Sequence, residues 1–254
     1  MRKRLSDIYC VFQIHLARLR RETGPFLLAA IAFPVGMYLF ASGIAQQNLA
    51  GSIPNESKIH FLAASLVFSL SLTAISWLGY LLLENRFTGR LKLFATLPLA
   101  PSSYIFGVLI FALMQGAIGT VSMIIAARLL GVETHIDGFS GVLQLTLTVF
   151  IALLSLCGTS VIIAARVRSF SEGSLYTDAL GAGIVLLAPV YYSSETLPFF
   201  IRWIGYVLPT TYIAGAVNKI LAGNPFIGGE LLVLSAMAAI TLAGGFSLMN
   251  WREE

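Results

Sequence analysis

The sequence predicts an all-α membrane protein with six transmembrane helices, an amphipathic interfacial helix before the first span and short re-entrant helices between the fifth and sixth spans. Composition supports this fold class, because 57% of the 254 residues are hydrophobic and 11% are charged, whereas soluble domains have about 25% charged residues. The apolar residues also gather in runs of about 20, the helix length that crosses a bilayer core. The alternating polarity of barrel strands is absent.

Residues 4–22 predict a helix lying along the cytoplasmic membrane surface. Apolar side chains recur there at helical spacing, and basic residues occupy the other faces. The positions concerned are Ile8, Phe12, Leu16, Leu19, Arg18 and Arg21. We interpret the basic face as directed toward anionic headgroups. The alternative is that the basic residues serve as a topology signal alone.

Six apolar runs predict the transmembrane helices. They are residues 26–45, 61–83, 104–127, 142–165, 175–192 and 231–249. Five of them lack Asp, Glu, Lys, Arg and His, while 175–192 is shorter and holds Asp178 near its start. An even number of spans places both termini on the same side of the membrane.

The basic residues predict which side that is. Twelve of them lie in one set of segments: Arg2, Lys3, Arg4, Arg18, Arg20, Arg21, Arg86, Arg90, Lys92, Arg166, Arg168 and Arg252. Four lie in the other set: Lys58, Arg128, Arg202 and Lys219. The positive-inside rule makes the richer side cytoplasmic, so residues 84–101 form a cytoplasmic loop.

Two spans carry stripes of small or hydroxylated residues. Ser65, Ser69, Thr73 and Ser76 recur on the second span, and Ser235, Ala239, Ala243 and Ser247 recur on the sixth. We interpret both as surfaces for close helix packing with interhelical hydrogen bonds. The alternative, for the first stripe above all, is a surface along the path of a substrate.

The outer segment 195–222 predicts a re-entrant or interfacial helical hairpin. Pro198 stands near the start of an apolar stretch that is too short to span, and Pro209 ends it. Its aromatic positions include Phe199, Trp203 and Tyr212. The alternative interpretation is an aromatic anchor at the membrane interface.

Several function classes lack their signature residues. The sequence has no phosphate-binding loop of the form GxxxxGK[ST] and no HExxH. Ser160 has no histidine within the spans to activate it, and no span centre holds the charged group that a proton-coupled pump requires. Basic residues cluster beside spans instead of forming a broad face for nucleic acid. Energy for uphill transport would therefore come from another polypeptide.

The cytoplasmic loop "ENRFTGRLKLFATLPLAPSS" carries a more specific pattern. Charged residues precede Gly89, a leucine-rich stretch follows it, and Pro98 stands nine residues after the glycine. With the outer stretch "ETLPFFIRWIGYVLPTTYIAGAV", this loop resembles the ABC-2 type transporter permease family. The loop departs from the family pattern because Phe87, Asn85 and Lys92 stand where relatives often carry acids.

The resemblance implies that residues 1–254 form a single transmembrane domain, the permease subunit of an ATP-driven exporter. The uncharged interior of the spans favours an amphiphilic substrate, such as a drug-like molecule, a lipid or a lipid-linked glycan, over a small ion. Partners would be a separate ATP-binding cassette subunit, a second permease copy or paralogue, and membrane lipid. ATP and magnesium would bind to the partner, with no catalytic or metal residue on this chain. The location would be the plasma membrane, with cytoplasmic termini.

The same resemblance implies the residues that couple this chain to the ATP-binding subunit. They are Glu84, Arg86, Gly89, Arg90, Lys92, Pro98, Arg166, Arg168 and Glu172. Two other functions stay open from the residues alone: a polytopic membrane enzyme acting on lipid, and a non-transporting assembly or sensor subunit.

Overall fold

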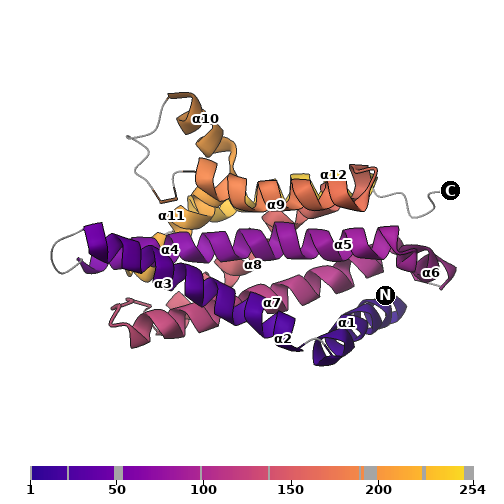
Figure 1. Ribbon diagram of the computed structural model, residues 1–254, viewed down its shortest axis with the longest axis horizontal. Coiled ribbons are helices and arrows are strands. Elements are labelled where there is room, and N and C mark those ends of the chain that lie inside the picture. Colours follow the sequence, from indigo (N-terminus) through magenta and orange to yellow (C-terminus); the bar gives the residue numbers. More distant parts are fainter. Residues whose placement is uncertain are drawn as a thin grey trace.

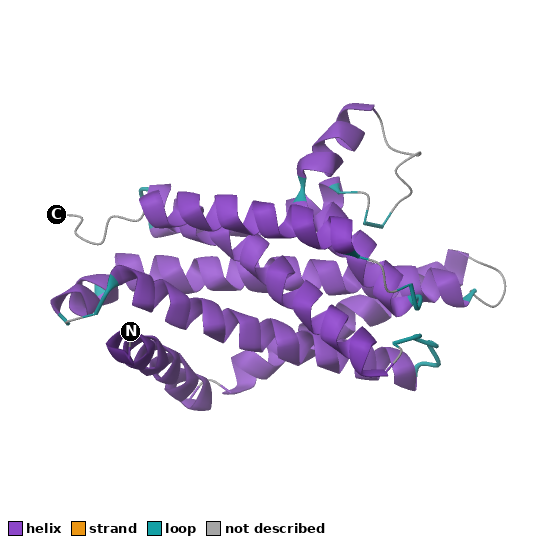
Figure 2. Ribbon diagram, turned by 180° about the vertical axis from the view of Figure 1, so that it is seen from behind, coloured by secondary structure: helices purple, strands orange, loops and turns teal. Residues whose placement is uncertain are grey.

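Helices make up every regular element of the described chain, which confirms the predicted all-α class. The computed structural model describes residues 2–21, 23–48, 54–97, 99–136, 138–188, 190–191, 199–224 and 227–248, and no strand occurs within these ranges (Figure 2). The elements are α1 (Arg2–Arg21), α2 (Thr23–Leu27), η1 (Leu28–Ala32), α3 (Phe33–Asn48), α4 (Asn55–Ser71), η2 (Leu72–Trp77), α5 (Leu78–Phe87), α6 (Arg90–Thr96), α7 (Pro101–Leu129), α8 (Gly138–Arg166), α9 (Phe170–Leu187), α10 (Phe199–Val207), α11 (Pro209–Leu221) and α12 (Gly228–Leu248). η1 and η2 are π-helical turns inside longer helices.

Within the described ranges, four helices are long and apolar enough to cross a membrane. They are Asn55–Phe87, Ser102–Leu129, Gly138–Arg166 and Gly228–Leu248. They cover the predicted spans 61–83, 104–127 and 142–165, and the described residues 231–248 of the predicted span 231–249. The predicted span 26–45 coincides with a shorter apolar helix, Leu28–Gly43. The predicted span 175–192 is helical from Phe170 to Leu187. These last two remain predicted spans.

The long helices lie side by side along the long axis of the molecule (Figures 1 and 2). The start of α1, the short helix α6 and the C-terminal end of α12 lie at one end of the bundle, and α10 stands away from it near the other end (Figure 1). The segments that carry most basic residues are therefore gathered at the α6 end.

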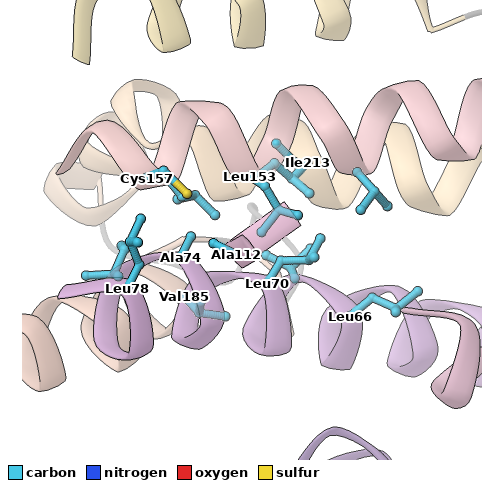
Figure 3. Close-up of a cluster of buried hydrophobic side chains, with 14 of the residues drawn as sticks. Leu66, Leu70, Ala74, Leu78, Ala112, Leu153, Cys157, Val185 and Ile213 are labelled. Carbon is cyan, nitrogen blue, oxygen red and sulfur yellow. The ribbon is translucent and has the colours of Figure 1, made fainter. Parts of the chain in front are cut away.

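The continuous helix formed by α4, η2 and α5 is the centre of the core. Leu66, Leu70 and Ala74 on this helix are buried together with Leu153 of α8 and Ile213 of α11 (Figure 3). Helices α7, α8, α9 and α11 all contact it. This packing explains why the second span is the most buried of the four.

The π-helical turn η2 is bound to its neighbours through hydroxyl groups. The Ser71 hydroxyl donates to the carbonyl of Gly181 (2.8 Å), and the Ser76 hydroxyl donates to the carbonyl of Thr177 (3.1 Å). From α8, the Ser160 hydroxyl donates to the carbonyl of Ala74. Because π turns disturb the regular hydrogen-bond ladder of a helix and recur at functional sites, η2 is a candidate functional feature.

The hydroxyl stripe of the second span faces inward. Ser65, Ser69, Thr73 and Ser76 are all buried, and the hydrogen bond of Ser76 to α9 supports the packing interpretation. Thr73 and Ser76 also line a cavity, so the alternative of a substrate path stays a prediction for these two positions.

The small-residue stripe of the sixth span does not pack against the described helices of this chain, and its interpretation as a packing surface stays a prediction. Ser235, Ala239, Ala243 and Ser247 are exposed. Helix α12 instead packs on α8 through a neighbouring face. That face holds Leu234, Ala238, Thr241 and Gly245. Helix α12 is apolar on all sides, and hydrophobic periodicity therefore gave no direction to its packing.

The outer segment folds into two helices at the end far from α6. Helix α10 is short and exposes Phe199 and Trp203, while α11 is buried against α4, α8 and α12. Pro209 occupies the first turn of α11, and the Tyr212 hydroxyl donates to the carbonyl of Tyr206 (2.8 Å), which ties the two helices together. Pro198 lies outside the described residues.

Helix α1 packs on α7 through a face one position away from the predicted one. Val11 is fully buried and His15 is 4% exposed, whereas the predicted positions Ile8, Phe12, Leu16 and Leu19 are only partly buried. At the crossing, a Cβ on Gly107 of α7 would lie 2.6 Å from the Val11 Cβ. Because Gly107 has no side chain, Val11 fits into the interface between α1 and α7.

Candidate functional site

Three consecutive residues at the end of α5 connect it to three different sides. Glu84, Asn85 and Arg86 lie in the last turn of α5. Successive residues of an α-helix point about 100° apart, so these three side chains reach different neighbours. We call this group, with its partners, the α5 node.

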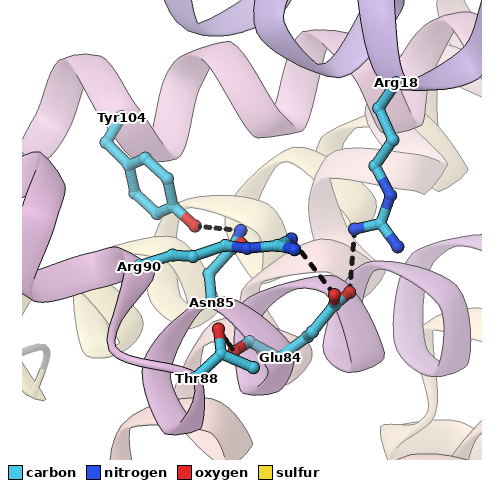
Figure 4. A network of polar contacts seen from close by, with 6 residues as sticks. All are labelled: Arg18, Glu84, Asn85, Thr88, Arg90 and Tyr104. Carbon is cyan, nitrogen blue, oxygen red and sulfur yellow. Dashed lines mark hydrogen bonds and ion pairs between the residues drawn. The ribbon is translucent and has the colours of Figure 1, made fainter.

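Glu84 joins two helices at the surface of the α6 end. Its carboxylate accepts hydrogen bonds from Arg18 of α1 (2.8 Å) and from Arg90 of α6 (3.1 Å), as Figure 4 shows. All three side chains are partly exposed, and such pairs contribute about 1 kcal/mol or less. The connection therefore orients α1 and α6 without fixing them strongly.

Asn85 makes the buried contact of the node. It is 2% exposed, and its side-chain amide donates to the hydroxyl of Tyr104 on α7 at 2.8 Å (Figure 4). The Tyr104 ring packs against Phe94 of α6, with ring centroids 5.3 Å apart. One buried tyrosine thus connects α5, α6 and α7.

Arg86 binds the end of α8. Its guanidinium donates to the carbonyls of Ala164 (2.5 Å) and Val167 (3.0 Å). These carbonyls lie at the C-terminal end of α8, where the helix dipole favours a cation. Arg86 was predicted to meet acidic groups of a partner subunit, and its nitrogen Nη1 instead lies within this chain's own fold.

Gly89 reverses the chain between α5 and α6. Its backbone has φ 77° and ψ 0°, a left-handed conformation that glycine adopts without the penalty of a side chain. The carbonyl of Gly89 accepts a hydrogen bond from the amide of Leu93 (3.2 Å). This turn sets the direction of α6, as the predicted special role of the glycine requires.

Helix α6 has one face on the bundle and one face free. Leu91 is 9% exposed, whereas Leu93 is 65% and Leu97 is 46% exposed. Lys92 is exposed beside them. The predicted proline end of this helix, Pro98, lies outside the described residues. The outer face is therefore both apolar and basic.

The predicted coupling residues Arg166, Arg168 and Glu172 lie around the start of helix α9. Ser169 caps α9 by accepting from the amide of Glu172 (3.1 Å), and Glu172 accepts from the amide of Arg168 (2.9 Å). The sequence is that of an S-x-x-E capping box, except that Glu172 accepts from the amide one residue before the cap. Arg166 and Arg168 are exposed, so they remain available at the α6 end.

His15 is the buried titratable group beside the node. Burial, with the nearby Arg18 and Arg90, lowers the pKa of His15 to about 4, and Glu84 opposes this shift. The imidazole is therefore neutral at pH 7. Its ring packs against Phe111 of α7, with centroids 5.7 Å apart.

Residues 6–222 match the ABC-2 type transporter family. The chain belongs to this family. It is also 27% identical over 245 residues to nodulation protein J of Azorhizobium caulinodans, and the match covers 94% of this chain and 93% of that protein. Together with the four long apolar helices, the family membership establishes a multi-pass membrane protein and a transporter permease.

The predicted site residues of this ABC-2 permease fall into three regions. Glu84, Arg86, Gly89, Arg90 and Lys92 lie at the α6 end together with Arg18 of α1, which pairs with Glu84. The hydroxyl stripe lies mid-bundle, and the residues of α10 and α11 lie at the opposite end (Figure 1). The predicted coupling residues, the predicted substrate path and the predicted outer segment therefore lie in three different parts of the fold.

Sequence reasoning missed several residues of the permease site. Asn85 was noted only as a departure from the family pattern, and Tyr104 and His15 were not selected. The S-x-x-E signal at Ser169 was readable as a capping box, whereas nothing local pairs Asn85 with Tyr104. Within the described part of the chain, no group of three His, Cys, Asp or Glu residues could hold a metal ion.

Proposed function

We propose that the chain is the membrane subunit of an ATP-driven exporter that acts as a pair of permease copies with two separate ATP-binding subunits. ATP and magnesium bind to those subunits, since this sequence has no phosphate-binding loop. The permease lies in the plasma membrane with six spans, including α9 and the helix around Leu28–Gly43, and both termini face the cytoplasm. The segment of α10 and α11 enters the outer leaflet without crossing it.

The observation that carries this proposal is the outer face of α6. Leu93 of α6 and Leu97, which directly follows the helix, are both exposed. The other face of α6 is anchored through Leu91 and the ring pair of Phe94 and Tyr104. An exposed apolar pair rimmed by basic residues is typical of a surface that another protein covers. A partner that pushes on α6 also acts on α1 and α5 through Glu84, so motion at this end reaches the bundle.

A co-purification experiment tests this. The permease is co-expressed with a candidate ATP-binding subunit, and the double variant Leu93→Asn and Leu97→Asn is compared with Phe139→Asn. Phe139 is 83% exposed but starts α8 at the opposite end of the bundle. We expect the double variant to lose the subunit and its ATP-dependent transport, and the control to keep both. Uphill transport by the permease alone in ATP-free vesicles would refute the proposal.

The enzyme alternative gains no support from Ser160. Its hydroxyl is buried and already donates to the carbonyl of Ala74. A nucleophilic serine needs a neighbouring base and an open side for the substrate. Ser160 instead joins α8 to the π-helical turn.

A further inference from the structure

A cavity of about 440 Å³ lies beside the α5 node. Its wall is formed by α1, α2, the η2–α5 segment, α7 and α9. It extends from Glu84 at the α6 end to Thr73 in η2, which are about 16 Å apart along a helix with a 1.5 Å rise. This depth is roughly half the thickness of a bilayer core, and the volume lies within the usual range of small-molecule sites.

Two buried side chains in this wall lack hydrogen-bond partners. The Nε2 atom of His15 and the Nε2 atom of Gln115 are both buried and have no partner among the described residues, and both residues line the cavity. His15 packs on Phe111, and Gln115 lies one helical turn beyond Phe111 on the same face of α7. A buried polar atom without a partner costs about 1–3 kcal/mol, so the pair indicates a polar ligand.

The charges of the wall oppose an anionic ligand. Glu84 and Asp178 supply two carboxylates, whereas Arg18 is the one cation in the lining and is paired with Glu84 (Figure 4). His15 is neutral at pH 7 because of its low pKa. Glu84 is also paired with Arg90 from outside the lining, so a phosphate group would meet the Asp178 carboxylate and a cation that is already paired.

The unpartnered nitrogens also oppose a permanent cation. The amide nitrogen of Gln115 is a donor and needs an acceptor, which a quaternary ammonium group lacks. A hydroxyl both donates and accepts, so it satisfies this amide and either tautomer of His15. The aromatic side chains of Trp77 and Phe26 in the same wall offer apolar surface to the rest of the molecule.

We infer that this cavity binds the uncharged, hydroxyl-bearing headgroup of an amphiphile through His15 and Gln115. Its open side receives the apolar tail, and the headgroup lies inside against His15 and Gln115. The role of the bound amphiphile as cargo rests on the proposed export function. Binding itself does not need ATP or a partner subunit.

Three amphiphiles with the same tail test the headgroup. Dodecyl maltoside, dodecyl phosphate and dodecyltrimethylammonium are titrated separately into full-length permease in phosphatidylcholine nanodiscs. Trp203→Phe and Trp251→Phe leave Trp77, a lining residue, as the fluorescent reporter. We expect dodecyl maltoside to bind saturably and more tightly than either charged probe. Equal or tighter binding of a charged probe, or no binding of any probe, overturns the inference.

Matched glutamine variants test the site. Gln115→Met should weaken dodecyl maltoside binding about tenfold, because one buried hydrogen bond is lost. Gln144→Met is the control, since Gln144 also has a buried atom without a partner but lies on α8 outside the cavity. Equal affinities of these two variants overturn the inference. His15→Phe repeats the test from α1. If binding persists but ATP-driven export is never observed, the site survives and the proposed function fails.

Discussion

Replacement of Gly89 by valine tests whether the turn before α6 requires a left-handed residue. With φ 77° and ψ 0°, Gly89 occupies a region that costs a β-branched residue about 1–3 kcal/mol. A Cβ at this position would meet nothing within 4 Å. The whole cost is therefore conformational, without a contribution from collision.

The expected consequence is a redirected or partly undocked α6. A cost of about 2 kcal/mol changes the ratio of native to non-native turn roughly 30-fold. The amide of Thr88 bonds to the carbonyl of Glu84 (2.9 Å) just before the glycine, and the amide of Leu93 bonds to the carbonyl of Gly89. Both bonds, and the Arg90–Glu84 pair, depend on the same backbone direction.

Hydrogen exchange measures this without a partner subunit. Amides 90–96 of purified Gly89→Val should exchange about 30-fold faster than those of the native protein where exchange follows local opening. Gly89→Asn should change little, because asparagine tolerates this conformation. In the co-expressed transporter, Gly89→Val should retain membrane insertion and uncouple ATP hydrolysis from transport.

A second control separates the turn from the valine itself. Gly183 of α9 has helical backbone and also meets nothing within 4 Å, so Gly183→Val should leave exchange in α6 unchanged. Native exchange rates in Gly89→Val would refute the conformational argument. Fast exchange with full coupling would instead refute the link between the α6 direction and transport.

Three further predictions concern neighbouring contacts. Arg86→Ala should lower stability in detergent by roughly 2 kcal/mol, because two carbonyls of α8 lose a charged donor. Arg86→Lys should lower stability by less than Arg86→Ala. An unchanged melting temperature for Arg86→Ala would contradict the role of Arg86 in binding the end of α8. Gly158→Val should lower the free energy of unfolding by roughly 2 kcal/mol or more, because its Cβ would lie 2.6 Å from the backbone carbon of Thr241. The control Gly183→Val should melt near the native temperature. Similar melting temperatures of the two variants would argue against the close approach of α8 and α12. His15 has a pKa of about 4 when α1 is docked and about 6.5 when it is not, so docking is most stable above pH 6.5 and loses roughly 3 kcal/mol as the pH falls to 4. Hydrogen exchange in α1 should therefore rise between pH 6.5 and 4, and more in the native protein than in His15→Phe. A flat pH profile would exclude His15 as the cause.

The bilayer made the long helices predictable. A span needs about 20 apolar residues whatever it packs against, so 61–83 and 142–165 were found by length alone. Because the spans are apolar on all sides, their sequences did not indicate which helix faces pack inside the protein. On α12 the exposed Ala239 and the buried Ala238 are the same residue type, and only the position of α8 distinguishes them.

The candidate site was predictable only in its local part. Gly89 could be found because a left-handed turn leaves a glycine in the sequence, and Ser169 with Glu172 could have been found as a capping box. The partners of Arg86 are 78 and 81 residues away, and no local pattern indicates them. A basic residue near a helix end looks the same in the sequence whether its acceptor lies inside or outside the chain, so the contact of Arg86 with a partner subunit stays a prediction.

The unequal strength of the α5 node indicates which helix moves when α6 is pushed. The Glu84 pairs with Arg18 and Arg90 are partly exposed and weak, whereas the Asn85–Tyr104 bond is buried. We therefore expect α1 to separate first, while α5 and α7 stay together, which would widen the cavity beside His15. Spin labels on Cys10, which is free and exposed, and on Arg168→Cys measure the distance between α1 and the start of α9. With the partner subunit bound, ATP should broaden this distance distribution, and Glu84→Gln should broaden it without ATP. A narrow distribution in every state would show that α1 and the bundle move as one body.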